Sequence, residues 1–358
     1  MLVLSKSDVA QITHSLSAQS LCDMIGTTMN SISNPPNSQS SVAPIQNPQR
    51  ISTESDSHKT LYMPSRLTTA RGTNTAIKVV AVPKPGCQIS GLPATTLLFD
   101  ETTGGVKAVL DSSELTGIRT AAVSALATQI LGPEKPEVLV VFGNGTQAYY
   151  HTRLLLELYP SIRKVCFAVR QLARLEELQT RLSPTFPKVH FSAELYGKAT
   201  DAVKNADIIC TCVPSTSPLF SSSNLKPGVH INAIGSYTPT MFEFPPSLIS
   251  ASSPPSLQEP KILTILVDSK EACLKEAGEL IAAGIEEKNL IEIGNLIDEN
   301  SQLRDDEATR TKLSSLRRDP GRRSLFKCVG VGGMDVAIAS LVFEQAEKLG
   351  IGKSIDFS

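Results

Sequence analysis

A glycine-rich turn between an apolar run and a helical stretch constrains the fold of this chain more than any other feature. It reads Gly143-Asn144-Gly145-Thr146-Gln147-Ala148, fits the pattern G-x-G-x-x-[GA], and follows the apolar run EVLVVF. In a strand–turn–helix unit the first glycine permits the tight turn, the second lets backbone N–H groups approach a pyrophosphate, and the alanine keeps the helix close to the sheet. The pattern predicts a dinucleotide site on these six residues; the alternative is a pair of ordinary turn glycines.

The residues after position 132 alternate between short β-branched runs and helical stretches. Strands are expected at EVLVVF, KVCFAV, KVHF, DIICTCV, VHINAIG and ILTILVD, and helices at 146–158, 171–182 and 198–205. Such alternation is typical of a parallel sheet covered by helices on both faces. We therefore predict an α/β fold in which residues 132–324 form a doubly wound, Rossmann-type domain.

The remaining residues predict a second, α+β domain. One helix is expected in the first thirty residues, with Ser5 and Ser7 as capping candidates, followed by a loose loop over 31–50. Strands are expected at TLYMPSRLT and NTAIKVVAVP, a hairpin at TTLLFDETTGGVKAVLD, and an Ala-rich helix at 114–131. The amphipathic last stretch, MDVAIASLVFEQAEKLG, is expected to pack back on this part. Residues 1–131 and 325–358 would then form one discontinuous domain.

Composition narrows the possible partners. Thirty-four Lys and Arg against 35 Asp and Glu leave a net charge of −1 over 358 residues, so no overall field attracts nucleic acid or an acidic membrane. Seven Cys without a C-x-x-C pair predict neither a disulfide framework nor a metal site. Because no apolar run reaches the ~18 residues of a membrane span and no leader pattern is visible, we expect a cytoplasmic protein. The charged segment 301–323 is interpreted as a solvated insertion, with a nuclear address as the alternative.

The residue after the second strand of the α/β part bears on the dinucleotide. This strand ends Ala168-Val169-Arg170, where an NAD-preferring domain would usually place Asp or Glu to bind the ribose 2′-hydroxyl. A guanidinium can instead pair with a 2′-phosphate. We therefore predict NADP(H) as the cofactor with Arg170 as its contact. NAD(H) and an ordinary exposed arginine at the strand end are the alternatives.

Several stretches, taken together, resemble the ornithine cyclodeaminase/mu-crystallin family. They are NPQR at 47–50, YMP at 62–64, IK at 77–78, GLP at 91–93, LTGIRTAA at 115–122, the turn from Gly143 to His151, LKPG at 225–228, INAIG at 231–235, and residues 330–335. They follow the family's order over nearly the whole chain. The strings L-T-x-x-R-T-A-A and G-x-G-x-Q-A-x-x-H are specific to the family.

The resemblance implies a homodimer, in which the N-terminal domain supplies the dimer sheet and the substrate pocket beside a nicotinamide-binding Rossmann domain. Activities known in the family include cyclising deamination of ornithine, reduction of cyclic ketimines, alanine dehydrogenation and amino-acid coupling through imines. All of them pass through an imine α to a carboxylate, with hydride moving to or from the nicotinamide. The expected substrate is a small imino or amino acid.

Four residues are candidates for handling such a substrate. A 2-imino acid needs cations on its carboxylate and a proton donor near its nitrogen. Arg119, at the start of the Ala-rich helix, offers a planar fork that suits a carboxylate. Lys78, within AIKVVAV, would have a lowered pKa if it faced the interior, which favours proton transfer. Lys78 and Arg119 are the predicted catalytic residues.

The resemblance further implies that Arg50 binds the substrate carboxylate and that Asp335 lies near the nicotinamide or substrate. Each candidate has a simpler interpretation. Lys78 could face outward, Arg119 could be a surface residue, and Asp335 could be a helix N-cap. His151, on the helix after the glycine turn, is interpreted as a packing residue.

One departure from the family pattern narrows the set of expected reactions. After VHINAIG, ornithine cyclodeaminases carry an aspartate that handles the amino group, whereas this chain places Tyr237 there. A phenol of pKa about 10 is not an anionic base at neutral pH. We therefore predict NADPH-dependent reduction of a preformed ketimine, or a related amino-acid dehydrogenation. The alternatives are ornithine cyclodeamination, with Glu243 or Asp335 replacing the aspartate, and a catalytically weak small-molecule binding protein.

Overall fold

The computed structural model describes residues 1–35, 42–69, 72–84, 86–87, 91–172, 175–249, 261–317 and 323–356. The chain divides into two compact units. Unit 1 comprises residues 1–119, 297–302 and 331–358, and unit 2 comprises residues 120–296 and 303–330. The Ala-rich helix α3 (Leu115–Leu131) crosses the boundary between them.

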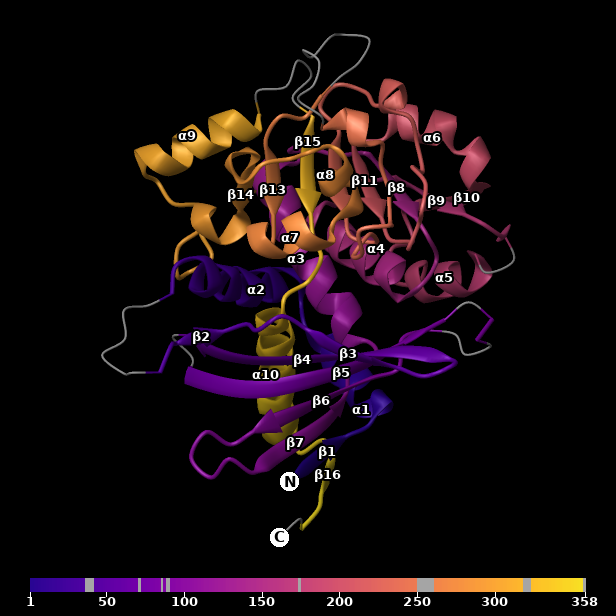
Figure 1. The fold of residues 1–358 in the computed structure, drawn as a ribbon. Coiled ribbons are helices and arrows are strands. Elements are labelled where there is room, and N and C mark those ends of the chain that lie inside the picture. The colour runs from indigo at the N-terminus through magenta and orange to yellow at the C-terminus, as the bar shows by residue number, and fades with distance from the viewer. Residues whose placement is uncertain are drawn as a thin grey trace. The chain divides into compact units, whose positions relative to one another are not determined.

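Unit 2 is built on an eight-stranded sheet in which every neighbouring pair is parallel. In spatial order the strands are β10 (His190–Leu195), β9 (Lys164–Val169), β8 (Val138–Phe142), β11 (Ile208–Thr211), β12 (His230–Ala233), β15 (Ser324–Lys327), β13 (Ile265–Val267) and β14 (Leu290–Glu292). The strand order reverses between β8 and β11, which is the switch point of a doubly wound sheet. The predicted Rossmann-type fold is confirmed (Figure 1).

Among the described residues, the first three helices of unit 2 lie in the predicted regions, and the three that follow them were not predicted. These helices are α4 (Thr146–Leu158), α5 (Leu175–Leu182), α6 (Thr200–Asn205), α7 (Lys270–Glu276), α8 (Gly278–Ala282) and α9 (Glu307–Leu316), with short 3-10 turns at Tyr196–Lys198, Ser222–Asn224, Pro246–Leu248, Glu287–Asn289 and Ile293–Leu296. Strand β8 is apolar throughout, and β11 is apolar except for Thr211, because both faces of these central strands are buried. Most residues of α9 are exposed or half-buried, as expected for a solvated segment, although Thr309 and Leu316 are buried; residues 318–322 lie outside the described ranges.

Unit 1 contains a mixed sheet. Its main path is β16 (Lys353–Ser354), β1 (Leu2–Leu4), β7 (Val106–Asp111), β6 (Ala94–Phe99), β5 (Gly72–Pro83), β4 (His58–Thr69) and β2 (Ile45–Gln46), while β3 (Ile51–Glu54) also pairs with β4. Only the β1–β7 pair is parallel among the described strands of this sheet. The hairpin predicted around ETTGG is confirmed as β6 and β7.

Within the described ranges, three helices belong wholly to unit 1: α1 (Lys6–Ser15), α2 (Ala18–Ser33) and α10 (Gly332–Leu349). The prediction of a single N-terminal helix is wrong, because Leu16 is extended and the Ser17 side chain accepts a hydrogen bond from the Ser20 N–H to start α2. Part of the expected loop at 31–50 lies in α2 and β2, and residues 36–41 lie outside the described ranges. Helix α10 packs against β4, β5 and α2, as predicted for the last stretch (Figure 1).

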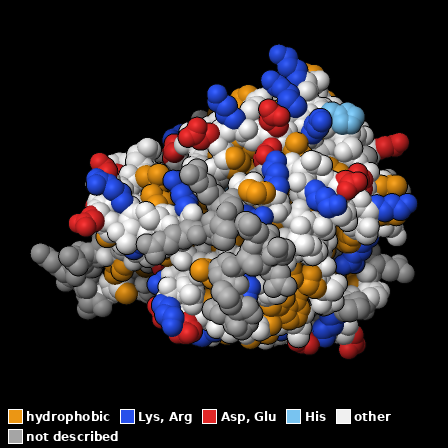
Figure 2. Space-filling view, turned by 90° about the horizontal axis from the view of Figure 1, so that it is seen from above, with side chains coloured by type: hydrophobic (Ala, Val, Ile, Leu, Met, Phe, Trp, Pro, Cys, Tyr) orange, Lys and Arg blue, Asp and Glu red, His pale blue; other side chains and the backbone are white. Residues whose placement is uncertain are grey.

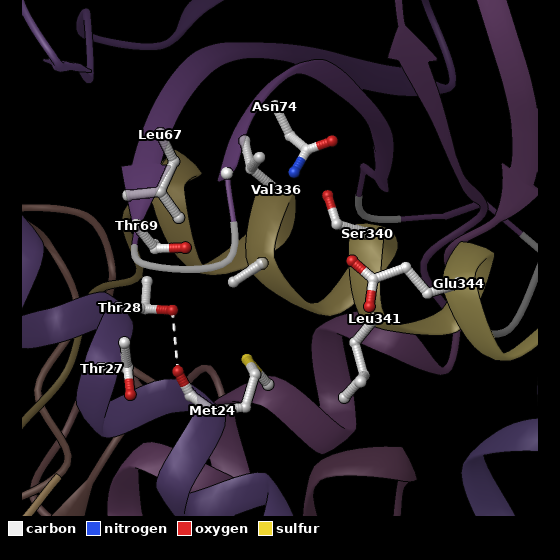
Figure 3. A pocket seen from close by; sticks show the side chains of 12 residues that line it. Met24, Thr27, Thr28, Leu67, Thr69, Asn74, Val336, Ser340, Leu341 and Glu344 are labelled. Carbon is white, nitrogen blue, oxygen red and sulfur yellow. Dashed lines mark hydrogen bonds between the residues drawn. The ribbon is translucent and has the colours of Figure 1, made fainter. Parts of the chain in front are cut away.

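A small hollow of about 40 Å³ lies between α2, the β4–β5 hairpin and α10. Figure 3 shows Asn74, Ser340 and Glu344 among the side chains that line it. Ser340 Oγ is buried and has no hydrogen-bond partner among the described residues. The hollow has room for a water molecule to hydrogen-bond this group. It is far smaller than the ~300 Å³ at which ligand pockets begin, so we do not place the substrate there.

The surface shows no bias toward one charge on the face that Figure 2 presents. Basic and acidic side chains are interspersed there, which gives no single-sign field on that face. Within the described ranges, none of the helices combines the length and apolarity that crossing a membrane requires.

Candidate functional site

The glycine turn after β8 is held in a conformation that only glycine adopts readily at its first position. Gly143 has φ +114°, and its N–H donates a hydrogen bond of 2.8 Å to Ala168 O. A Cβ at Gly143 would lie 2.9 Å from Val213 Cγ1 and 3.3 Å from Cys212 O. A side chain here would therefore strain the backbone and also collide with the segment that follows β11.

The second glycine of the turn leaves the start of α4 open. Gly145 is the N-cap of α4 and no side chain caps this end. A Cβ on Gly145 would meet nothing within 4 Å. The first N–H groups of a helix lack partners within the helix and carry its partial positive charge. An uncapped helix start beside open space therefore fits a pyrophosphate.

A cavity of about 380 Å³ lies beside this turn. It is lined by residues that follow four neighbouring strands: Gly143, Asn144, Gly145, Arg170, Gln171, Tyr196, Cys212, Val213 and Pro214. In doubly wound sheets, ligands bind at the carboxyl ends of the strands, at the switch point. Thr146 begins α4, and Ala148 is buried as the close packing of helix and sheet requires. The residues present therefore fit a dinucleotide.

Arg170 lies at the edge of this cavity. It is exposed and follows the last residue of β9, and it is succeeded by Gln171 and not by a carboxylate. Burial raises the pKa of the Tyr196 phenol, and the neighbouring Arg170 partly opposes that shift. Arg170 thus adds a positive charge to the rim of the cavity.

A second cluster of candidate residues lies in unit 1. Along β5, Ala76, Lys78 and Val80 are buried on one face, and Lys78 is only 3% exposed. The interpretation of Lys78 as an outward-facing lysine is therefore wrong. Its Nζ lies 2.7 Å from Asp335 Oδ2 in a buried ion pair.

The Asp335 carboxylate binds two cations at once. Its other oxygen, Oδ1, accepts a hydrogen bond of 3.2 Å from Nε of Arg119, which is also buried. The N-cap of α10 is Val331 and not Asp335, so the interpretation of Asp335 as an N-cap is wrong. The start of α10 is itself fixed, because the Gly333 N–H donates to Asn47 Oδ1 at 2.8 Å. A strand and two helices thus supply the cluster.

The charges of this cluster do not balance. Burial lowers the pKa of Lys78 to about 8, an effect that Asp335 opposes and that Arg119 and Arg50 strengthen. Although burial opposes its ionisation, Lys78 and Arg119 hold the pKa of Asp335 below its ordinary value. Arg50, which is partly exposed, is thus close enough to act on Lys78. Lys78 and Arg119 both contact the single carboxylate of Asp335, so among the described residues these three side chains carry a surplus positive charge that favours a further anion.

His151 has the packing role that the sequence indicates. Its Nδ1 hydrogen-bonds to Gln147 O at 2.8 Å and its Nε2 to Ser124 Oγ at 2.9 Å. Burial lowers the pKa of His151 to about 4. A neutral imidazole that uses both ring nitrogens in this way holds α4 in place.

The two residues considered as replacements for the cyclodeaminase aspartate are both engaged elsewhere. Glu243 is fully buried, and its Oε2 accepts hydrogen bonds from Gly235 N at 2.7 Å and Ser236 N at 3.0 Å. Asp335 is engaged by Lys78 and Arg119. Tyr237 is half-buried after β12. These contacts weigh against direct deamination of ornithine.

Sequence reasoning missed a buried polar cluster in unit 2 that contains Glu243, Glu279, Ser236 and Lys327. One signal for it exists in the sequence. Lys327 interrupts the apolar strand SLFKCVG much as Lys78 interrupts AIKVVAV. A lysine in such a run is rarely buried without a partner.

Comparison with known proteins decides the family. The model of the ornithine cyclodeaminase/mu-crystallin family matches residues 5–350. The chain belongs to this family. The resemblance read from its motifs is therefore confirmed.

Curated members of the family are similar over most of their length. A Δ(1)-pyrroline-2-carboxylate reductase of Bacillus cereus is 30% identical over 78% of this chain and 80% of its own. Ketimine reductase mu-crystallin of Mus musculus is 31% identical over 70% and 69%. Protein SAR DEFICIENT 4 of Arabidopsis thaliana is 29% identical over 87% and 89%.

Solved structures share the fold of the whole chain. Δ(1)-pyrroline-2-carboxylate reductase of Thermococcus litoralis, in complex with NADH and L-proline, aligns with a TM-score of 0.80 at 22% identity and covers 99% of this chain and 100% of its own. An archaeal alanine dehydrogenase dimer with bound NAD aligns with a TM-score of 0.78 at 21% identity, covering 100% and 99%.

Proposed function

We propose that this member of the ornithine cyclodeaminase/mu-crystallin family reduces the C=N bond of a small 2-imino acid with a reduced nicotinamide cofactor. The buried cluster of Lys78, Arg119 and Asp335 carries the proposal, because its surplus of positive charge suits the substrate's carboxylate. The names of the bacterial and mouse relatives, both imine reductases, support the same reaction.

Each residue of the cluster has a chemical task in this reaction. The Arg119 guanidinium orients the substrate carboxylate, and Arg50 adds a second positive charge. Lys78 Nζ holds the proton that the substrate nitrogen receives, since burial lowers its pKa to about 8. Asp335 keeps Lys78 protonated and holds both cations in place. When bound, the reduced nicotinamide supplies the hydride that the imine carbon gains, so the product is an amino acid.

We further propose NADPH as the preferred cofactor, with NADH as the alternative. Arg170 supports this, because it lies on the rim of the cavity beside the glycine turn. The strand-end carboxylate that would select the 2′-hydroxyl of NADH is missing from Val169-Arg170-Gln171. NADH and NAD are the dinucleotides named with two related structures, so the preference has to be measured with both cofactors.

A homodimer is the assembly that we propose. On β4, β5 and β6, most of the residues that alternate with the buried ones are half-buried, and the apolar ones among them include Tyr62, Pro64, Ile77, Val79, Leu97 and Phe99, beside the polar Arg66, Thr68 and Thr75. An apolar sheet face of this kind is typical of an interaction surface. A second copy of the chain fits it, and one related structure is named as a dimer. Light scattering of the purified protein measures the assembly directly.

The reaction is tested by oxidation of NADPH, followed by absorbance, with Δ1-pyrroline-2-carboxylate, Δ1-piperideine-2-carboxylate, or pyruvate plus ammonia. We expect turnover with at least one cyclic imino acid. If no cofactor is oxidised with any of the three, the proposal fails. Proline and ammonia formed from ornithine would favour the cyclodeaminase instead, and tight binding of an imino acid without turnover would favour a binding protein.

A further inference from the structure

Unit 2 contains a fully buried cluster with more carboxylates than cations. Glu243, Glu279 and Lys327 are each 0% exposed. Ser236 joins them, because its hydroxyl donates to Glu279 at 2.6 Å and accepts from Lys327 Nζ at 2.6 Å. Lys327 Nζ also donates to Ser236 O at 2.7 Å and lies 3.8 Å from Glu243 Oε2. One ammonium group thus lies near Glu243 directly and is connected to Glu279 through Ser236.

The Glu243 carboxylate connects the ends of two neighbouring strands. Its Oε2 accepts from the N–H groups of Gly235 and Ser236, which follow β12, at 2.7 and 3.0 Å. Its Oε1 accepts from the N–H of Val213, which follows β11, at 3.4 Å. The segments are packed so closely that a Cβ on Gly235 would overlap both Val213 O and Glu243 Oε1.

One of these contacts leads directly to the candidate dinucleotide cavity. Val213 lines that cavity, and its Cγ1 is the atom that a Cβ on Gly143 would strike. Glu243 therefore contacts, from inside the protein, the segment that forms one wall of the cavity. The carboxylate itself is buried away from the cavity's surface.

We infer that Glu243 is a positioning residue for the dinucleotide, whose ionised carboxylate holds the segments after β11 and β12 in the binding conformation. The inference rests on the proposed function, since it assumes that a dinucleotide binds beside the glycine turn. Glu243 acts through Val213 and through the backbone of Gly235 and Ser236. It does not touch the ligand.

Protonation of Glu243 reduces its capacity to accept hydrogen bonds from backbone N–H groups. Burial raises the pKa of Glu243 to about 7, Glu279 on α8 adds to the rise, and Lys327 on β15 opposes it. Cys210, Cys212 and Tyr196 are the other titratable groups that interact with it electrostatically. A protonated carboxyl presents an O–H toward backbone N–H groups and loses an acceptor. Dinucleotide affinity should therefore fall as the pH falls through about 7.

The test compares dinucleotide binding by wild type and Glu243→Gln, measured by isothermal titration calorimetry across the pH range. The amide keeps one acceptor but turns an N–H group toward backbone donors. We expect the Kd for NADPH above the pKa to rise about tenfold, as for the loss of one hydrogen bond to a charged group. The Kd of the variant should also lose its pH dependence. With saturating dinucleotide, kcat should stay within about twofold, because no group that contacts substrate is changed.

A matched control is Glu292→Gln in the same unit, whose carboxylate accepts from Lys270 N at 3.0 Å. This variant should bind dinucleotide like wild type. Titration of the 2′-phosphate is common to all three proteins and cancels in the comparison. Repeating the wild-type titration with NADH, which has no 2′-phosphate, tests the pH dependence even if Glu243→Gln does not fold.

Two results would overturn the inference: a wild-type Kd and pH profile in Glu243→Gln, or a flat pH profile for NADH binding to wild type. Either one leaves the proposed function intact. A wild-type protein that binds neither NADPH nor NADH refutes the proposed function itself.

Discussion

The two units each bury a cluster of charged side chains, and the clusters have opposite imbalances. In unit 1, the cations of Lys78 and Arg119 share the single carboxylate of Asp335. In unit 2, Glu243 lies 3.8 Å from the ammonium group of Lys327, and Glu279 is connected to the same ammonium group through the Ser236 hydroxyl. In the second cluster, backbone N–H groups supply the missing positive partners. The sign of the imbalance thus agrees with the two proposals, in which the cluster of unit 1 binds an external anion and the cluster of unit 2 holds the chain's own backbone.

Both clusters have a cost and a consequence. Removing a charge from water is unfavourable unless partners replace the hydration. Here the penalty moves the pKa values of two groups toward neutral pH, since burial lowers the pKa of Lys78 to about 8 and raises that of Glu243 to about 7. Groups shifted in this way are enriched at functional sites.

The largest effect is expected from Lys78→Met, which removes both a cation and the proposed proton donor while keeping the length of the side chain. We expect kcat/KM for the imino acid to fall about 10³-fold, within the range of general acid–base groups. The control is Lys59→Met, an exposed lysine on the neighbouring strand β4, which should act like wild type. If steady-state kinetics give Lys78→Met and Lys59→Met the same kcat/KM, then Lys78 takes no part in the reaction.

A second effect concerns the carboxylate of the same cluster. In wild type, Lys78 is charged below its pKa of about 8, so kcat/KM should fall as the pH rises through that value. Asp335 raises the pKa of Lys78. In Asp335→Asn, kcat/KM should therefore begin to fall at a lower pH than in wild type. The substitution should also lower the maximal kcat/KM about 100-fold, because two buried cations lose their only counter-charge in the cluster. If kcat/KM falls at the same pH in Asp335→Asn as in wild type, a group other than Lys78 controls this pH dependence.

The sequence predicts the regions of this fold where local pattern and burial agree. The strand KVCFAV and the helix at 146–158 occur at the predicted residues, because apolar runs buried on both faces and an uninterrupted helical period leave few alternatives. The division between α1 and α2 was missed although Ser17 is a capping residue, because the apolar period continues across it. Strands β1 and β3 are only three and four residues long and carry no alternation to detect.

The sequence predicts the charged clusters less well than it predicts the fold. Lys78, Arg119 and Asp335 were brought together only by resemblance to the family, since 216 positions separate Arg119 from Asp335. From the sequence, Glu243 was considered as a possible replacement for the cyclodeaminase aspartate, and nothing local distinguishes it from a surface carboxylate. Its role depends on packing of α8 and β15 against the turn after β12, which no pattern within one segment encodes.

A third effect distinguishes Arg170, at the rim of the dinucleotide cavity, from Glu243, which is buried behind its wall. Arg170 is exposed at that rim, so Arg170→Ser should raise KM for NADPH about tenfold through loss of a charge-assisted contact to the 2′-phosphate. KM for NADH should change less than about threefold, because that cofactor lacks the phosphate. By contrast, Glu243→Gln should weaken both cofactors. Equal losses for NADPH and NADH in Arg170→Ser would refute the proposed preference.

The smallest effect is expected from the second carboxylate of the unit 2 cluster. Glu279 contributes to the raised pKa of Glu243 because its negative charge opposes ionisation nearby. Glu279→Gln removes that charge but keeps an acceptor for the Glu243 N–H. The midpoint at which dinucleotide affinity falls should therefore move to lower pH by up to about one unit, the scale of one buried charge interaction. Above the midpoint, the Kd should stay within about threefold of wild type. A midpoint that rises, or a pH dependence that disappears, would contradict the assignment of this titration to Glu243.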